Sequence, residues 1–173
     1  GRTKAQGEAD VRKFVPTATI LRPSIVFGAE DQFFNRFAAM ARSAPFLPSI
    51  GGGRTKFQPV YAGNVASAIA AAVDTDMAAG RTFELGGPGV YTFNELYDII
   101  LKTIDLKRFK LPLPFFVARP MGYIIGAVWR FVPPFSWGFL GAPPLTGSQV
   151  EMLKDDNVVA PGALTLADLG VKD

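Results

Sequence analysis

The side chains that could perform chemistry in this chain are limited, because its 173 residues include neither cysteine nor histidine. A thiolate nucleophile and a disulfide scaffold both need cysteine. Ser-His-Asp and Cys-His catalysis both need an imidazole. Zinc sites in proteins use mainly the same two residue types, so a classical zinc site is excluded and we expect no metal.

Two clusters of glycine are the next candidates for a binding site. Gly51-Gly52-Gly53 has the appearance of a phosphate loop, but a dinucleotide fingerprint needs G-x-G-x-x-G between a strand and a helix. These glycines precede an expected strand instead, so we predict a turn with positive φ angles. The same argument predicts such a turn at residues 86–89, which read Gly-Gly-Pro-Gly.

The charge of the chain argues against a nucleic-acid partner. Lys and Arg number 18 and Asp and Glu number 15, which gives a net charge of +3. Nucleic-acid binding needs basic residues in a stripe or patch, whereas here they are dispersed. The unusual count is aromatic, with 15 Phe and 2 Trp. We therefore expect the chain to bury apolar surface against more than its own core.

Strands and helices alternate along the expected secondary structure. Apolar and β-branched runs predict strands at residues 17–22, 57–61, 81–85 and 108–111. Apolar residues at helical spacing predict helices at 32–42, after Asn64 as N-cap, and after Thr92, which forms a capping box with Glu95. Residues 45–53 read as a loop, and Thr146 with Gln149 reads as a second capping box. The alternation predicts an α/β fold.

Several segments, in their order and spacing, resemble the extended and atypical short-chain dehydrogenase/reductases. They are residues 1–8 (GRTKAQGE), 21–28 (LRPSIVFG), 59–66 (PVYAGNVA) and 83–88 (FELGGP). The resemblance implies the C-terminal portion of a Rossmann-like parallel sheet with a small helical substrate lobe. It implies that residues 1–110 are the C-terminal part of the NAD(P)-binding domain, with interleaved segments of the substrate lobe. Residues 111–173 would form a mostly helical, aromatic-rich C-terminal lobe.

The resemblance also implies roles for individual residues. The family carries a Tyr-x-x-x-Lys pair on one face of a helix, in which the tyrosine is the general acid/base of hydride transfer. Lys4 falls on the lysine, which lowers the phenol pKa and binds the nicotinamide ribose, and the tyrosine would stand one position before Gly1. Without the resemblance, Lys4 reads as an ordinary exposed helix lysine.

The implied cofactor is NAD or NADP, and the loop after the first strand is expected to lie beside its nicotinamide. Pro23, Ser24, Ile25 and Val26 form this loop, and backbone groups near Ser24 and Ile25 would face the carboxamide. The glycine fingerprint that binds the pyrophosphate belongs to the first half of the family's fold. We therefore expect this chain by itself to bind a dinucleotide weakly and to be inactive.

Two positions depart from the sugar-nucleotide epimerases of the family. Ile25 stands where those enzymes usually have asparagine, and Phe57 where they usually have arginine, both of which contact the nucleotide diphosphate. An aliphatic and an aromatic side chain cannot pair with phosphate oxygens, and Lys56 is expected on the opposite face of its strand. Asn64 replaces an aspartate, which changes little because both residues cap helices. A sugar-nucleotide substrate is therefore not expected.

Within the family, the closest likeness is to the NAD(P)-binding accessory subunits of respiratory complex I and their bacterial relatives. Residues 51–61, 111–114 and 144–154 carry this likeness. It implies a non-catalytic accessory subunit with a structural nucleotide, peripheral on the cytoplasmic or matrix side of the energy-transducing membrane. Two alternatives stay open: an active NAD(P)-dependent reductase, dehydratase or epimerase acting on an apolar substrate, and a purely structural docking domain without cofactor.

An apolar helix is predicted at residues 115–131, but Arg119, Pro120 and Arg130 interrupt it. A membrane-spanning helix needs about 20 apolar residues without central charges, so we do not expect this one to cross a membrane. The two arginines lie about three turns apart on one face. Such a helix suits a lipid headgroup boundary or a partner protein, and equally its own core. Residues 113–145 are therefore the predicted contact with complex I subunits or a membrane surface, and an open sheet edge predicts an oligomer or strand swap.

Overall fold

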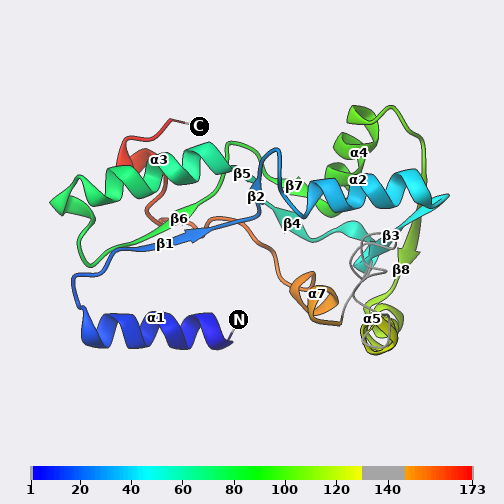
Figure 1. Ribbon diagram of the computed structural model, residues 1–173, viewed down its shortest axis with the longest axis horizontal. Coiled ribbons are helices and arrows are strands. Elements are labelled where there is room, and N and C mark those ends of the chain that lie inside the picture. The colour runs from blue at the N-terminus through cyan, green and yellow to red at the C-terminus, as the bar shows by residue number, and fades with distance from the viewer. Residues whose placement is uncertain (1, 130–146, 173) are drawn as a thin grey trace. The chain divides into compact units, whose positions relative to one another are not determined.

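The computed structural model describes residues 2–129 and 147–172 (Figure 1). The chain divides into two compact units. Unit 1 comprises Gly1–Asp31, Phe57–Val90 and Asn157–Asp173, and unit 2 comprises Gln32–Lys56 and Tyr91–Asp156. Each unit is thus built from segments that are distant in the sequence. The predicted lobe boundary between residues 110 and 111 stays a prediction.

Unit 1 is built on parallel strand pairs. β1 (Ile20–Pro23) pairs with β6 (Thr82–Leu85), so that Ile20 lies opposite Thr82 and Pro23 opposite Leu85. β2 (Val26–Phe27) pairs in parallel with β5 (Val60–Tyr61). The helical elements are α1 (Arg2–Phe14), α3 (Ala62–Val73), η2 (Asp76–Ala78) and η4 (Ala167–Leu169). Parallel strands connected through helices confirm the predicted α/β fold class.

The core of unit 1 joins three separate stretches of the chain. Phe83 and Leu85 point inward from β6, since burial alternates along this strand. Ala68 from α3 and Leu166 from the C-terminal segment pack in the same cluster. Because distant segments supply its members, this core forms only when the parallel strands have paired.

Unit 2 contains a third parallel pair, in which β3 (Phe46–Ile50) lies beside β8 (Phe109–Leu113). Its helical elements are α2 (Phe34–Ser43), η1 (Gly51–Gly53), α4 (Phe93–Thr103), α5 (Phe115–Trp129) and α7 (Gly147–Met152). β4 (Lys56–Phe57), where the chain passes from unit 2 to unit 1, pairs with β7 (Tyr91–Thr92). The strands predicted at 17–22, 81–85 and 108–111 are therefore confirmed, and the one at 57–61 divides into β4 and β5 around Pro59.

Four aromatic rings form the centre of unit 2. Phe37 contacts Phe93 and Tyr97 edge to face, with ring centroids 5.4 and 5.2 Å apart, and Phe33 contacts Phe37 at 5.0 Å. Burial raises the pKa of the Tyr97 phenol, whose hydroxyl donates to the Pro48 carbonyl at 3.1 Å. This core therefore accounts for some of the 15 phenylalanines of the chain.

Two local predictions are wrong and have physical reasons. Residues 45–53 are not a loop, because Leu47, Ser49 and Ile50 are buried in β3 in spite of Pro48. Asn64 is not an N-cap, because α3 begins at Ala62 and places Asn64 in its first turn.

The capping box at the start of α4 is confirmed. The Glu95 N–H donates to the Thr92 hydroxyl at 3.3 Å, and the Thr92 N–H donates to the Glu95 carboxylate at 2.6 Å. Hydrogen bonds from the Thr92 N–H and the Thr92 hydroxyl to the carboxylate lower the pKa of Glu95. The second predicted box begins at Thr146, which lies outside the described residues.

The glycine clusters differ in their reasons for being glycine. Gly51, Gly52 and Gly53 have φ angles of 60°, 72° and 65°, which confirms the predicted turn. At Gly86 and Gly87 the predicted positive φ is wrong, since neither residue lies in that region. A Cβ at Gly87 would lie 2.1 Å from the Pro59 carbonyl oxygen, so close backbone approach requires this glycine.

Helix α5 is confirmed from Phe115 to Trp129 with Pro120 inside it, whereas Arg130 lies outside the described residues. Among the residues that the structure describes, we find no helix with the length and apolar character needed to span a membrane.

Replacing Gly87 by alanine is expected to lower the free energy of unfolding by about 1–3 kcal/mol, because the new methyl group overpacks against the Pro59 backbone. The matched control is Gly7→Ala in α1, where a Cβ would meet nothing within 4 Å. This control should leave stability unchanged or slightly raised, since alanine favours helix. Urea denaturation measures both, and equal midpoints for the two variants would contradict the close approach.

Candidate functional site

The predicted cofactor loop lies at the carboxyl ends of the strands of unit 1. β1 ends at Pro23 directly opposite Leu85, the last residue of β6. Ligands of open α/β sheets bind outside the carboxyl ends of the strands. The structure therefore brings Pro23, Ser24, Ile25 and Val26 to the edge where a nucleotide would sit. Ser24 and Ile25 are half-buried there, and Pro23 and Val26 are exposed.

Backbone hydrogen bonds fix the path of this loop. The Ser24 N–H donates to the Leu85 carbonyl and the Val60 N–H donates to the Ile25 carbonyl, both at 2.9 Å. The Ser24 hydroxyl donates to the Asn157 carbonyl at 2.9 Å. In the part of the chain that the structure describes, the Ile25 N–H has no acceptor and the Ser24 carbonyl has no donor.

These two groups belong to one peptide unit, so they point in opposite directions. A single carboxamide can therefore bind only one of them. Its oxygen would accept from Ile25, or its NH₂ would donate to Ser24. The loop thus offers backbone recognition that is independent of the Ile25 side chain.

Lys4 reaches the same edge through the direction of α1. Arg12 on α1 donates to the Thr82 hydroxyl at the beginning of β6, whereas Glu8 bonds Arg22 near the end of β1. The helix therefore runs antiparallel to both strands (Figure 1). Because Lys4 comes one turn before Glu8, its position on the helix is toward the carboxyl ends of the strands. Lys4 is exposed, and within the described residues it makes no hydrogen bond or ion pair.

An ionic network holds α1 to the sheet. The Arg22 guanidinium lies 3.0 Å from one Glu8 oxygen through Nε and 3.5 Å from Glu84 through Nη1. Glu84 also accepts from the Ala160 N–H at 2.8 Å. Hydrogen bonding and attraction to Arg22 lower the pKa of the Glu8 carboxyl. This network was not predicted, and its only signal in the sequence is the opposite charges on the expected helix and strand.

The predicted orientation of Lys56 is confirmed. Phe57 is buried whereas its neighbour Lys56 is exposed, so the two point to opposite faces of β4. Ile25 places an aliphatic side chain at the loop. Within the described residues, no cluster of acidic side chains offers a metal site.

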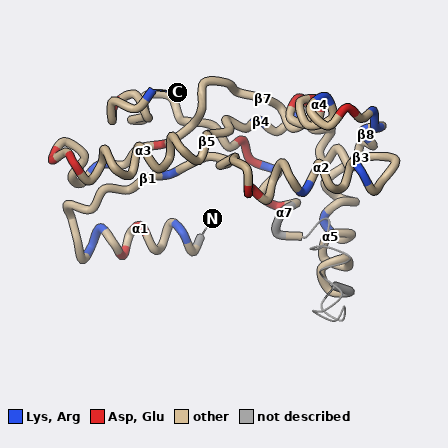
Figure 2. Tube along the Cα trace, turned by 45° about the horizontal axis from the view of Figure 1, so that its top comes forward, with Lys and Arg blue, Asp and Glu red and all other residues tan. Residues whose placement is uncertain are grey.

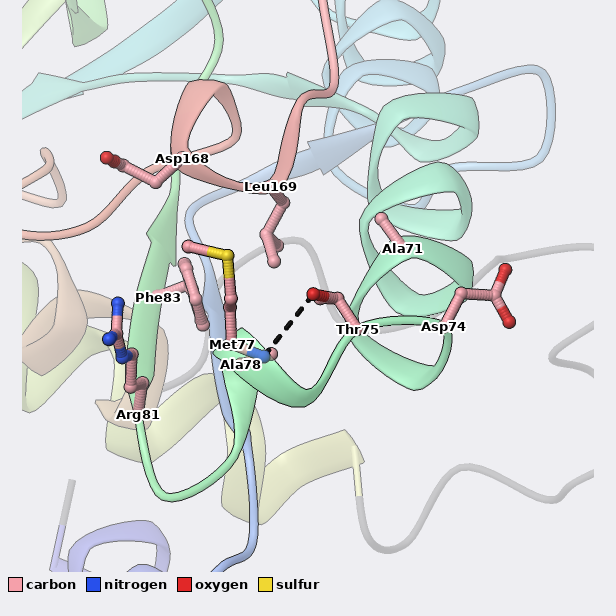
Figure 3. A pocket seen from close by; sticks show the side chains of 9 residues that line it. All are labelled: Ala71, Asp74, Thr75, Met77, Ala78, Arg81, Phe83, Asp168 and Leu169. Atoms are coloured by element: carbon pink, nitrogen blue, oxygen red, sulfur yellow. Dashed lines mark hydrogen bonds between the residues drawn. The ribbon is translucent and has the colours of Figure 1, made fainter.

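A small cavity of about 160 Å³ lies elsewhere in unit 1 (Figure 3). Arg81 and Phe83 line it from the beginning of β6, and Asp168 and Leu169 line it from η4. Because it lies at the amino end of β6, it is opposite the edge formed by Pro23–Leu85. Ligand pockets commonly measure about 300–1,000 Å³, so this cavity is too small for a dinucleotide.

Comparison with known proteins agrees with this geometry. Residues 9–96 match the 3-beta hydroxysteroid dehydrogenase/isomerase family. The chain belongs to this family. Membership confirms the predicted resemblance to short-chain dehydrogenase/reductases.

One curated relative in Arabidopsis thaliana is named NADH dehydrogenase (ubiquinone) 1 alpha subcomplex subunit 9, mitochondrial. It is 40% identical over 174 residues, which cover 97% of this chain and 41% of the relative. The chain thus spans less than half the length of this relative.

Two solved structures share the fold. The crystal structure of gox2253 has a TM-score of 0.60 at 17% identity and covers 99% of this chain and 49% of its own. UDP-glucuronic acid 4-epimerase from Bacillus cereus, solved with UDP-glucuronic acid and NAD, has a TM-score of 0.53 at 20% identity. The match covers 94% of this chain and 46% of the epimerase chain. At these identities the likeness shows the Rossmann-like fold alone.

The variant Glu8→Gln is expected to lower the melting temperature at neutral pH, because it removes the charged partner of Arg22. The folded pKa of Glu8 is lowered from its ordinary value of 4.5. The carboxylate therefore stabilises the fold above pH 4.5, and this contribution is lost as the pH falls through the lowered value. The difference from the native protein should shrink below about pH 4.5.

Glu30→Gln serves as the control, since Glu30 is exposed and makes no ion pair in the described residues. It should leave the melting temperature unchanged across the same range. A deficit of Glu8→Gln that persists undiminished in acid would show that the ion pair is not its cause.

Proposed function

We propose that this chain is part of a non-catalytic, NAD(P)-binding accessory subunit of NADH:ubiquinone oxidoreductase, respiratory complex I. The observation that carries the proposal is the 40% identity, over 97% of the chain, to the Arabidopsis alpha subcomplex subunit 9. The edge geometry of unit 1 supports the nucleotide-binding part of the proposal. Because the chain spans only part of that relative, the proposal concerns the longer protein to which the chain corresponds.

In this proposal Lys4 and the loop from Pro23 to Val26 bind the nicotinamide half of NAD or NADP. Lys4 supplies an unpaired ammonium group for the ribose hydroxyls, and the backbone at Ile25 supplies one hydrogen-bonding group for the carboxamide. The position of both at the carboxyl edge supports this assignment. NAD would supply redox chemistry only in a whole protein that also provided a general acid and a substrate site.

The proposed subunit is peripheral, on the matrix or cytoplasmic side of the energy-transducing membrane, and contacts complex I subunits or the membrane surface through residues 113–145. Of this segment, α5 lies within the described residues. Phe116, Tyr123 and Ile124 are exposed on it, and their i, i+7 and i+8 spacing gathers them on one face. A largely apolar exposed face of this kind favours contact with a partner.

The first strand pair offers a second association site. Among the described residues, β1 pairs with β6 alone, which leaves its other edge without a strand. We propose that this edge takes a strand from the remainder of the longer protein or from a second copy.

The test of the nucleotide site is Lys4→Met in the full-length protein, with NAD and NADP binding measured by calorimetry. Losing a charged hydrogen-bond donor costs about 1.5–3 kcal/mol, so we expect affinity to fall at least tenfold. The control Lys13→Met removes an exposed lysine of the same helix and should bind as the native protein does. Equal affinity for all three proteins would contradict the role of Lys4.

The test of the subunit assignment is co-purification of the full-length protein with respiratory complexes. Ile124→Asp should reduce recovery, because a carboxylate is buried without a partner at the proposed contact. The control Val73→Asp alters an exposed apolar residue of unit 1 and should leave recovery unchanged. Recovery of the native protein only as a free enzyme with turnover would overturn the proposal in favour of a reductase, dehydratase or epimerase.

A further inference from the structure

Helix α4 covers one face of the β3–β8 pair of unit 2. Of the other face, here called the open face, the beginning is exposed among the described residues, whereas Ile50 at its end is buried. Ser49 on the covered face donates to Asn94 of α4 at 2.8 Å, and Lys110 reaches Asp98 of α4 at 2.7 Å. Side chains alternate along strands, so the neighbouring residues point away from α4. In the parallel register, Phe46 lies opposite Phe109 and Pro48 opposite Leu111 on this open face.

The open face is apolar and accessible. Phe109 is 67% exposed, Phe46 is 45% exposed and Leu111 is 40% exposed. Since neighbouring strands lie only about 4.8 Å apart, these side chains form one continuous patch. We call Phe46, Pro48, Phe109 and Leu111 the sheet patch. Part of the phenylalanine excess therefore lies on a surface rather than in the aromatic core.

Basic residues border the sheet patch at the end where both strands begin. Arg42 is in the last turn of α2, shortly before β3, and Lys107 directly precedes Arg108 and β8. Arg108 donates to the Ala41 carbonyl at 2.7 Å, which holds the start of β8 against the end of α2. Arg42 and Lys107 are exposed, and neither makes an ion pair within the described residues. Figure 2 shows basic positions along this end of unit 2.

Acidic groups near this border are few. Asp98 is paired with Lys110 on the covered face, which leaves Asp105 as the acidic residue in the turn after α4. Lys102, in the last turn of α4, is a third exposed cation here. The border therefore carries a net positive charge beside exposed aromatic rings.

We propose that the sheet patch and its basic border bind an anionic lipid surface. The aromatic and aliphatic side chains enter the boundary between headgroups and acyl chains, and Arg42, Lys102 and Lys107 contact the phosphate groups. The sheet patch includes none of residues 113–145, and the inference does not depend on the assignment to complex I.

A second copy of the chain fits this surface less well. Stable dimers bury about 1,200–2,000 Å² in total, whereas the sheet patch consists of four side chains. A two-fold contact would also bring the basic border of one copy toward that of the other. An anionic surface instead complements the charge and accepts a small apolar patch.

Vesicle flotation with the full-length protein tests the proposal. The probes are vesicles of phosphatidylcholine alone and of phosphatidylcholine with phosphatidylglycerol. We expect binding to the anionic vesicles, weakened by salt, and little binding to the neutral ones. The double variant Phe46→Ser/Phe109→Ser should reduce the affinity for the anionic vesicles at least tenfold. Arg42→Gln and Lys107→Gln should each reduce this affinity about fivefold.

The controls are matched in type and exposure. Phe14→Ser removes a phenylalanine that is 79% exposed in unit 1, and Lys13→Gln removes an exposed lysine beside it. Both should bind vesicles as the native protein does, and circular dichroism verifies that every variant is folded. Equal binding to neutral and anionic vesicles would overturn the proposal, as would binding that the sheet-patch variants leave intact.

Two further measurements distinguish the neighbouring explanations. If only Ile124→Asp abolished vesicle binding, α5 and not the sheet patch would be the lipid contact. If light scattering showed a dimer that Phe46→Ser/Phe109→Ser dissociated, the occupant would be a second copy. Failure to co-purify with respiratory complexes would overturn the subunit assignment and leave vesicle binding as a separate result.

Discussion

The parallel pairing of β1 with β6 is the constraint on which the structure of unit 1 depends. Parallel strands cannot be joined by a tight turn, so the chain must travel far before it returns. Here the intervening stretch contains both α3 and the first segment of unit 2, Gln32–Lys56. The return brings Leu85 beside Pro23 and creates the carboxyl edge where the Ser24 N–H is fixed. The path of the loop proposed to bind the cofactor, the direction of α1 and the buried side chains of β6 all follow from this one pairing.

The phenylalanines of this chain serve two physically different purposes. Phe37 and Phe93 contact each other and Tyr97 in the middle of unit 2, where edge-to-face packing adds to the burial of apolar area. Phe46 and Phe109 lie opposite each other on the uncovered face of the β3–β8 pair. Composition alone reveals the excess but cannot separate these purposes, because both sets occur in apolar runs with similar neighbours. The register of the strands and the exposed fractions of the side chains show which rings the described residues leave uncovered.

Local patterns predicted those features whose causes are local. The capping box of Thr92 and Glu95, the positive φ angles of residues 51–53 and the alternation of strands and helices follow from short stretches of sequence. The wrong predictions at Gly87 and at residues 45–53 have non-local causes. Gly87 is glycine because the Pro59 backbone passes against it, and β3 forms through Pro48 because β8 pairs with it. The Glu8–Arg22–Glu84 network was missed for the same reason, since its members meet only after the strands have paired.

In the proposed function, the carboxyl edge recognises the cofactor and a substrate through different groups. The groups proposed to bind the nicotinamide carboxamide are backbone atoms of Ser24 and Ile25, and the sheet holds them in place whatever side chains stand there. Recognition of a nucleotide diphosphate depends instead on side chains, and here Ile25 and Phe57 cannot supply it. Substitution at such positions can therefore abolish binding of a phosphorylated substrate and leave the fold and the cofactor edge intact. Because the cofactor would be bound by backbone atoms and the substrate by side chains, substitutions can convert an enzyme of this fold into a nucleotide-binding subunit without turnover.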